Sequence, residues 1–355
     1  MTPAAEEIKT VNGGLYVCAI VEERETNSEL IRCANEAQGE IQLIGHGEIT
    51  AVVMVQSVHQ PVSRDRQELV RKLLVHQQLV EKFMEIAAVL PVKFGTLAPN
   101  RESVELALER GRDKFITAFS DLSGKTQFEI TVTWDVAEVF AEIAKEPAVI
   151  DLKTDLAAMS ENDRHVNLDQ LGKLVKETLD HRRTQTGKAL LDALLHVGFD
   201  GIVNPILNDS IVLNMALLVD TDRTEALDLC LDELDNTFHN ALTLRCVGPM
   251  PPHSFATVEI KYIEPTKVSH ACCILELVAA NSFEEVRSAY HRLARQAHQE
   301  IASDGVEDGT VCSSIGELND AYKTLISFVD SGGPVVVSVL RQEAAYATDM
   351  ASSTD

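Results

Sequence analysis

The sequence predicts an α+β protein with two α+β domains, the second of them ferredoxin-like, followed by a small α-helical segment. Three observations support this fold class. Before residue 268, short apolar stretches typical of strands alternate with long amphipathic stretches typical of helices. The order of these elements is similar in two successive parts of that region, although no residue-level repeat links them. From residue 268 to residue 330 the pattern is helical.

The first domain is predicted over residues 1–135. In order, we expect strand, helix, hairpin, helix, strand, helix and strand at residues 14–21, 27–38, 41–56, 64–88, 89–96, 101–122 and 128–135. The first strand is continuously apolar, which indicates burial. The last strand alternates between apolar and polar residues, which indicates one buried face. Asn100 is placed to cap the helix that follows it.

The long helix over residues 64–88 carries an apolar stripe that predicts packing against the sheet. Its expected members are Leu69, Leu73, Leu74, Leu79, Val80, Phe83 and Ile86. Ser63 is the expected N-cap of this helix.

The second domain is predicted over residues 136–267. We expect a helical connector at 136–163, a helix at 168–197, two strands within 198–220, a helix at 222–240 capped by Thr221, and two strands within 242–260. A helix, a hairpin, a helix and two strands are consistent with a small ferredoxin-like sandwich.

The helical segment is predicted over residues 268–330, and residues 331–355 form a tail. Ser282 and Glu285 have the spacing of a capping box at the start of a helix over 283–299. A return helix is expected at 315–329. The two helices have apolar faces that require burial against each other or against the preceding domain.

The charge and composition exclude several functions. The chain has 355 residues and a formal net charge of −24, from 55 acidic and 31 basic residues. Nucleic acid and anionic lipid membranes require a basic surface, so we expect neither as a partner. The acidity is spread along the chain. It is consistent with simple solubility or with a protein that must stay dispersed beside an aggregation-prone partner.

The sequence contains no motif typical of a zinc-binding helix, a phosphate-binding loop or a catalytic nucleophile. The eleven histidines include no pair at the one-turn spacing of a zinc-binding helix, and no phosphate-binding loop or nucleophile elbow is present. The seven cysteines form no CxxC pair, which favours a reducing compartment. The polar N-terminus and the lack of an apolar run of about 20 residues favour a cytoplasmic protein. We therefore expect no enzyme, no cofactor and no metal site.

Two stretches are candidate partner-binding surfaces. In VLPVKFGT, Lys93 and Phe94 lie either at the end of an ordinary core strand or at a partner-binding edge. In GPMPPHSF, the prolines form either a fixed turn between strands or an exposed, rigid recognition ridge. The candidate residues of this second stretch are Pro251, Pro252, His253 and Phe255.

Four blocks in this order resemble gas vesicle proteins of the F/L class. They are GLYVCAIV, LLVHQQLVEKFMEIAAVLPVKFGT, the strand ending in Trp134-Asp135, and GPMPPHSFATVEI. The resemblance implies a two-domain α+β fold, with a ferredoxin-like second domain and no catalytic residues. It also implies a minor, shell-associated gas vesicle component or an assembly factor that acts with the small hydrophobic shell protein and other gas vesicle proteins.

The helical segment resembles a different family. SFEEVRSAYHRLARQAHQE and ELNDAYKTLI are similar to the second and third helices of the J-domain of DnaJ-type co-chaperones. The His-Pro-Asp tripeptide of such domains stands here as His298-Gln299-Glu300. This second resemblance implies an alternative function, a co-chaperone-like adaptor that recruits Hsp70 through the J-like segment.

Overall fold

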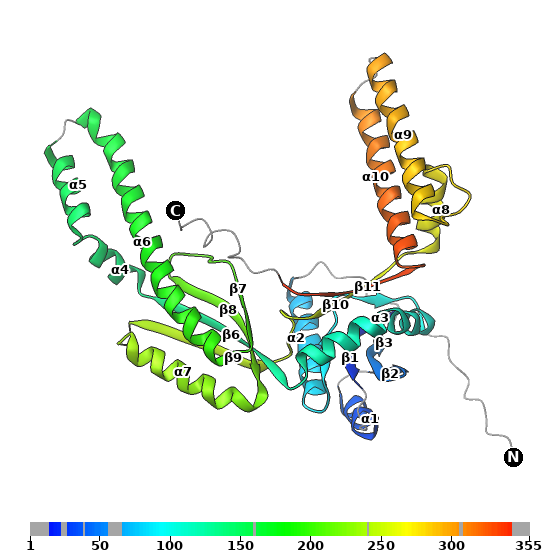
Figure 1. Ribbon diagram of the computed structural model, residues 1–355, viewed down its shortest axis with the longest axis horizontal. Helices are drawn as coiled ribbons and strands as arrows, with labels where there is room; N and C mark the ends of the chain where they lie inside the picture. Colours follow the sequence, from blue (N-terminus) through cyan, green and yellow to red (C-terminus); the bar gives the residue numbers. More distant parts are fainter. Residues whose placement is uncertain are drawn as a thin grey trace. The chain divides into compact units, whose positions relative to one another are not determined.

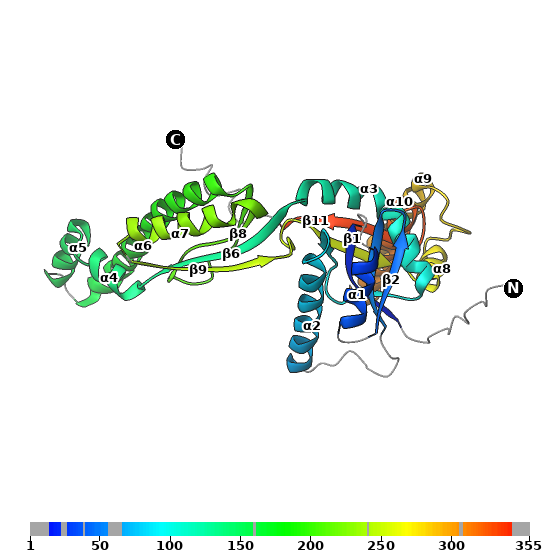
Figure 2. The same ribbon diagram turned by 90° about the horizontal axis from the view of Figure 1, so that it is seen from below.

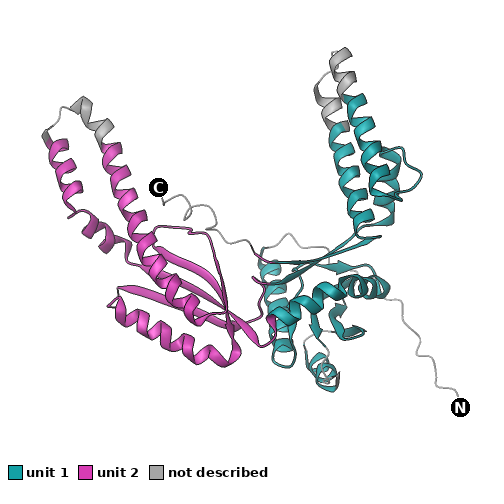
Figure 3. Ribbon diagram, viewed as in Figure 1, with its two compact units in different colours: residues 1–121, 256–340 teal, residues 122–255, 341–355 magenta. Residues whose placement is uncertain are grey.

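The computed structural model describes residues 14–22, 27–37, 40–55, 66–158, 161–239, 241–304 and 308–342. The chain divides into two compact units (Figure 3). Unit 1 comprises Met1–Asp121 and Ala256–Leu340, and unit 2 comprises Leu122–Phe255 and Arg341–Asp355. Each unit is built on an antiparallel sheet with helices packed against it, which confirms the predicted α+β class.

The main sheet of unit 1 is formed by the first third of the chain (Figures 1 and 2). Its elements are β1 (Leu15–Glu22), α1 (Asn27–Glu36), β2 (Ile41–His46), β3 (Ile49–Val55), α2 (Arg66–Met84), β4 (Val89–Pro91) and β5 (Leu97–Ala98). The strand order is β2-β3-β1-β4, and every pair is antiparallel. A βαββαβ chain with this strand order has the ferredoxin-like topology.

Strand β1 lies in the middle of this sheet and is buried from Leu15 to Val21, as its continuous apolar run predicted. Helices α1 and α2 cover one face of the sheet in a cluster that includes Leu30, Leu79 and Phe83. On β1, Ile20 is fully buried although it lies outside that cluster, so the opposite face is buried too.

The prediction for α2 was wrong over its first half. Leu79, Val80 and Phe83 are buried, but Leu69 and Leu73 are about half exposed, at 49% and 48%. An apolar stripe predicts burial only where another element covers it. Here β1, β4 and α1 cover only the second half of the helix. The expected cap Ser63 lies outside the described residues.

Helix α3 (Arg101–Leu122) begins and ends where the sequence predicted. The Ser103 N–H donates to Asn100 Oδ1 at 2.8 Å, which confirms the predicted cap. The side chains of Arg110 and Lys114 donate to backbone carbonyls of Gly332 and Val337, both at 2.7 Å. These bonds fasten α3 to β11 (Val335–Leu340) and to the turn that precedes it. Strand β11 lies within the stretch predicted as a tail.

The remainder of unit 1 is a two-stranded ribbon and a helical cluster. Strand β10 (Thr257–Tyr262) pairs with β11, and helices α8 (Pro265–Ile274), α9 (Phe283–Asp304) and α10 (Asp308–Asp330) lie between them in the sequence. Leu275, Val286 and Leu325 are fully buried where the three helices meet. The Glu285 N–H donates to Ser282 Oγ at 3.3 Å, which is one of the two hydrogen bonds of the predicted capping box and confirms Ser282 as the cap of α9.

The second sheet belongs to unit 2. Its elements are β6 (Lys125–Trp134), α4 (Val136–Ile143), α5 (Pro147–Ala158), α6 (Glu161–Val197), β7 (Asp200–Val203), β8 (Ile211–Asp220), a 3-10 turn (Thr221–Arg223), α7 (Thr224–Thr237) and β9 (Leu242–Met250). The antiparallel order β7-β8-β6-β9 is again ferredoxin-like. Figure 2 shows α6 and α7 on one side of this sheet.

The cap predicted for α7 was wrong. The helix starts at Thr224, and its N-cap, Arg223, makes no side-chain capping bond. Thr221 Oγ1 instead donates to the Gly124 carbonyl at 2.8 Å. Thr221 begins the 3-10 turn that precedes α7, so it lies three residues before the first residue of the helix and outside the N-cap position.

Two strands lie in sheets other than those predicted. We assigned β6 to the first domain, yet it lies between β8 and β9 in unit 2. We assigned β10 to the second domain together with the preceding strand, β9, yet it pairs with β11 in unit 1. The Pro-rich turn explains the second error, because prolines cannot donate the hydrogen bonds that would continue a β9-β10 hairpin. The sequential domain boundaries after residues 135 and 267 stay predictions.

Candidate functional site

The predicted surface at Lys93 and Phe94 is a tight turn that follows β4. The Thr96 N–H and the Thr96 hydroxyl both donate to the Lys93 carbonyl, at 3.2 Å and 2.7 Å. Gly95 has a φ of +89°, which the third position of a type II turn requires and which glycine adopts without strain. The sequence KFGT therefore folds as a rigid turn that leaves the Lys93 side chain exposed.

The aromatic ring of Phe94, within the turn, packs against the rings of His76 and Tyr16. The Phe94 ring centroid lies 5.6 Å from that of His76 and 6.2 Å from that of Tyr16, in edge-to-face arrangements. The Tyr16 hydroxyl is hydrogen-bonded to His76 Nδ1 at 2.9 Å and accepts the Gly95 N–H at 3.3 Å. Burial lowers the pKa of His76 and raises the pKa of Tyr16. Both groups are therefore neutral near pH 7, and they stabilise the turn by packing and hydrogen bonding.

Opposite the turn lies β10, and the space between them is a groove of about 400 Å³. We call it the β10 groove; residues 93–97 and 259–262 line it. The Glu259 carboxylate accepts from Lys93 Nζ at 2.6 Å and from Lys261 Nζ at 2.8 Å. These lysines, Lys261 first, lower the pKa of Glu259. Two lysines and one carboxylate make this rim net positive on a strongly acidic chain.

The predicted surface at the Pro-rich turn lies in unit 2. Pro251, Pro252 and Phe255 are buried, and of the candidate residues in this turn only His253 is exposed. Phe255 packs against Ile202 and other apolar residues of the sheet. The structure therefore describes a fixed turn rather than a ridge of exposed prolines, and partner binding by these residues stays a prediction.

A buried glutamine fixes the Pro-rich turn. Gln127, which is fully buried on β6, accepts the Ser254 N–H at 2.9 Å and donates to Ser254 Oγ at 3.0 Å. Its amide also donates to Glu129 Oε1 at 2.6 Å. Burial raises the pKa of Glu129, although the hydrogen bond from Gln127 and the nearby His253 oppose this shift.

The six predicted residues thus form two separate sets. Lys93 and Phe94 belong to unit 1, whereas the residues of the Pro-rich turn belong to unit 2. Sequence reasoning missed Glu259, Lys261 and Tyr262, which line the β10 groove. The Tyr262 hydroxyl is buried and has no hydrogen-bond partner among the described residues. The alternating charge in the stretch VEIKY was the one available signal for this strand face.

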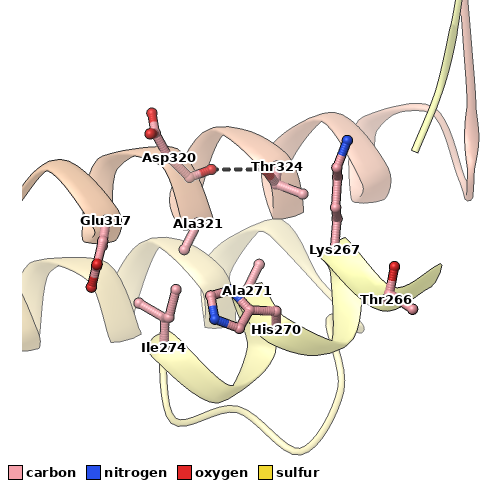
Figure 4. Close-up of a pocket in the computed structure, with 9 residues that line it drawn as sticks. All are labelled: Thr266, Lys267, His270, Ala271, Ile274, Glu317, Asp320, Ala321 and Thr324. Carbon is pink, nitrogen blue, oxygen red and sulfur yellow. Dashed lines mark hydrogen bonds between the residues drawn. The ribbon is translucent and has the colours of Figure 1, made fainter. Parts of the chain in front are cut away.

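A second groove, of about 530 Å³, lies between α8 and α10 (Figure 4). Ala271, Ile274 and Ala321 form its apolar part. Figure 4 shows Lys267 and His270 on α8, with Glu317 and Asp320 on α10. Across the described parts of the chain, no group of three or more His, Cys, Asp or Glu side chains could hold a metal ion. No described helix is long and apolar enough to cross a bilayer.

A comparison with models of protein families identifies the family of this chain. The model of a family described as "Gas vesicle synthesis protein GvpL/GvpF" matches residues 14–257, which is more than half of the chain. The chain belongs to the GvpL/GvpF family. This confirms the resemblance to the F/L class, and it supports a role connected with gas vesicles. Family and fold are those of gas vesicle proteins rather than of enzymes.

Individual relatives agree with the family assignment. The chain is 25% identical to gas vesicle protein L1 of Halobacterium salinarum over 266 residues, which cover 71% of this chain and 93% of that protein. It is 24% identical to gas vesicle protein F of a Streptomyces species, over 52% of this chain and 77% of that protein. Association with other gas vesicle proteins follows at the level of the family.

Solved structures confirm the fold. The chain is similar to the crystal structure of GvpF from an Anabaena species, with a TM-score of 0.58, 18% sequence identity, and coverage of 68% of this chain and 97% of that one. GvpF from Microcystis aeruginosa is similar with a TM-score of 0.54, 20% identity, and coverage of 69% and 98%. The family match ends at residue 257, before helices α8 to α10.

Proposed function

We propose that this GvpL/GvpF protein is a cytoplasmic assembly factor that binds the small hydrophobic shell protein of the gas vesicle before it polymerises. As a minor component associated with the shell, it supports nucleation or growth of the vesicle. Family membership carries this proposal. The high negative charge supports it, because a strongly charged chain keeps itself, and a bound aggregation-prone partner, dispersed.

The β10 groove is the surface we propose for this contact. It presents an exposed lysine and a partly exposed aromatic ring, both on a rigid turn, opposite the strand β10. A preorganised surface loses little conformational freedom when a partner binds. The Pro-rich turn supplies a second candidate contact through His253, whose side chain is exposed.

A co-purification experiment tests the proposed function. The full chain carrying an affinity tag should retain the shell protein at physiological salt, and a strain that lacks the gene should form few or no gas vesicles. A matched control uses the same tag on an unrelated acidic protein. Absence of co-purification, together with normal vesicles in the deletion strain, would overturn the proposal.

We also propose an alternative function, that of a co-chaperone-like adaptor, which rests on helices α9 and α10. Helices α9 and α10 pack side by side, and the Tyr290 hydroxyl donates to Asn319 Oδ1 at 2.6 Å between them, so the required helical hairpin exists. The tripeptide is His298-Gln299-Glu300 rather than His-Pro-Asp. Stimulation of Hsp70 ATPase activity by the full chain would support a co-chaperone-like adaptor, and unchanged ATPase activity would eliminate it.

A further inference from the structure

The β10 groove contains an open strand edge. Strand β10 pairs with β11 on one side, in the register Thr257 with Leu340 to Tyr262 with Val335. On its other side, the chain that follows β4 makes a single parallel bridge, between Val92 and Val258. Beyond this bridge the chain turns away at residues 93–96, and the groove opens between the two segments.

The register fixes which backbone groups face the groove. The Ile263 N–H donates to the Pro334 carbonyl on the β11 side, whereas the Val258 carbonyl accepts the Lys93 N–H on the opposite side. In an antiparallel ribbon, successive residues direct their N–H and C=O groups to alternate edges. Glu259 and Lys261 therefore pair with β11, while the backbone groups of Ile260 and Tyr262 face the groove. No other described segment pairs with this edge.

We infer that the β10 groove receives an extended segment of a partner polypeptide, which adds as a strand to the backbone edge at Ile260 and Tyr262. Unpaired N–H and C=O groups on a strand edge form a template for an additional strand. The neighbouring rigid turn, with Phe94 partly exposed, forms the opposite wall.

The rim specifies the chemistry of the added segment. Lys93 and Lys261 are 57% and 65% exposed, and both bind the one carboxylate of Glu259. The rim therefore carries a positive excess on a chain whose net charge is −24. Opposite charges across an interface guide association and register. The segment is accordingly an extended stretch that bears an acidic side chain beside its edge-pairing residues.

This inference deepens the proposed function and rests on it, because it takes the small shell protein as the partner that supplies the segment. The contact is mainly between backbones, so side chains of many kinds satisfy it and the register depends on the acidic residue. A strand that is held in this way has one of its two edges blocked from pairing with other copies of the shell protein.

Residue-resolved hydrogen exchange on the full wild-type chain, with and without purified shell protein, tests the inference. In the free protein, the amides of Glu259 and Lys261 should be protected and those of Ile260 and Tyr262 should exchange quickly. On addition of shell protein, the amides of Ile260 and Tyr262 should slow by at least tenfold. Binding without this change would overturn the inference and leave the proposed function intact.

Two further outcomes are also decisive. If no shell protein binds, the proposed function itself fails, and the assignment of the partner fails with it. If the amides of Ile260 and Tyr262 become protected simply when the free chain is concentrated, the edge pairs with a second copy, which overturns the inference of a partner strand.

A pair of variants separates the backbone from the side chain. Ile260→Pro removes the N–H that faces the groove but leaves the β11 hydrogen bonds of its neighbours in place. Ile260→Val keeps that N–H and most of the buried side chain. We expect Ile260→Pro to weaken shell-protein binding at least tenfold relative to Ile260→Val, with melting curves confirming that both fold. Equal binding by two folded variants would contradict the inference, and the exchange experiment decides the matter if Ile260→Pro does not fold.

Discussion

In unit 1, β1 is buried on both faces from Leu15 to Val21. In unit 2, the strand in the same topological position is β6, and it alternates. Its Ile130 and Val132 face α6 and α7, whereas Glu129, Thr131 and Thr133 are only partly buried on the other face. One strand order therefore supports a central strand that is enclosed on both faces in unit 1 and one that is half-open in unit 2.

This difference shows that the strand order of a sheet does not determine which of its surfaces are exposed. A ferredoxin-like chain fixes which strands are neighbours, but the segments added outside the βαββαβ core decide what covers the sheet. In unit 1 the added segments are α3, which follows the core in the sequence, and β10, β11 and the helical cluster, which come from residues 256–340. Its accessible candidate site is an edge beside the sheet, whereas unit 2 presents a fixed turn and part of a sheet face.

The largest effect should come from the face opposite the helices. Ile20→Ala on β1 removes a fully buried side chain and should lower the free energy of unfolding by about 2–5 kcal/mol. The matched change Thr131→Ala, on the corresponding face of β6, should alter it by less than about 0.5 kcal/mol. Urea denaturation followed by circular dichroism measures both. Similar losses from the two variants would show that the sheets are equally enclosed.

Removal of the Gln127 side chain tests whether the Pro-rich turn is fixed. Gln127→Ala leaves the buried Ser254 N–H without its partner, and should cost about 1–3 kcal/mol. The chain has one tryptophan, Trp134 on β6, so its fluorescence during urea denaturation reports on unit 2. An unchanged midpoint would mean that the turn does not depend on Gln127.

Two helical glycines should respond in opposite directions. A Cβ on Gly111 of α3 would overlap the buried Phe115 ring and lie 2.8 Å from Val337 Cγ1, so Gly111→Ala should destabilise unit 1 by about 1–3 kcal/mol. A Cβ on Gly172 of α6 meets no heavy atom within 4 Å. Gly172→Ala should therefore stabilise unit 2 by about 0.5–1 kcal/mol. Thermal melting of both variants checks the signs, and stabilisation by both would contradict the close packing of α3.

Acidification should affect the two units differently. Burial lowers the pKa of His76 in unit 1, so its contribution to stability is complete above about pH 6.5 and is lost as the pH falls through its folded pKa. Burial raises the pKa of Glu129 in unit 2, so its contribution exists below about pH 4.3 and is lost as the pH rises through its folded pKa.

Melting temperatures at pH 7.5 and pH 5.5 test this contrast. His76→Gln should reduce the loss of stability between these pH values, whereas Glu129→Gln should raise the melting temperature at pH 7.5. A wild-type pH dependence that His76→Gln leaves unchanged would show that protonation of His76 is not its source.

Local patterns predicted the fold to the extent that local interactions determine it. The contrast between β1 and β6 was visible as continuous against alternating apolar residues, and Asn100 was visible as a cap. The burial of α2 and the sheets of β6 and β10 were not predicted, because they depend on segments that are distant in sequence. Local periodicity does not specify which strand pairs with which.

The candidate site shows the same limit. Lys93 and Phe94 were found from the sequence, since a lysine in an apolar run beside a glycine indicates a strand end. Glu259 and Lys261 were missed, although Glu259 binds Lys93 directly, because 166 positions separate these two residues. No single-sequence signal links two charged residues at that distance, and only the strand pairing brings them to one groove.

The most direct test of the account compares two charge reversals in the binding of labelled peptides that span the shell protein. Lys93→Glu combined with Lys261→Glu reverses the rim of the β10 groove, while Lys173→Glu combined with Lys267→Glu makes the same charge change at exposed positions outside it. By fluorescence anisotropy, the first pair should weaken binding by about tenfold or more, and the second by less than about twofold. Equal weakening by the two pairs, or no weakening by the first, would contradict the assignment of the β10 groove as the binding site.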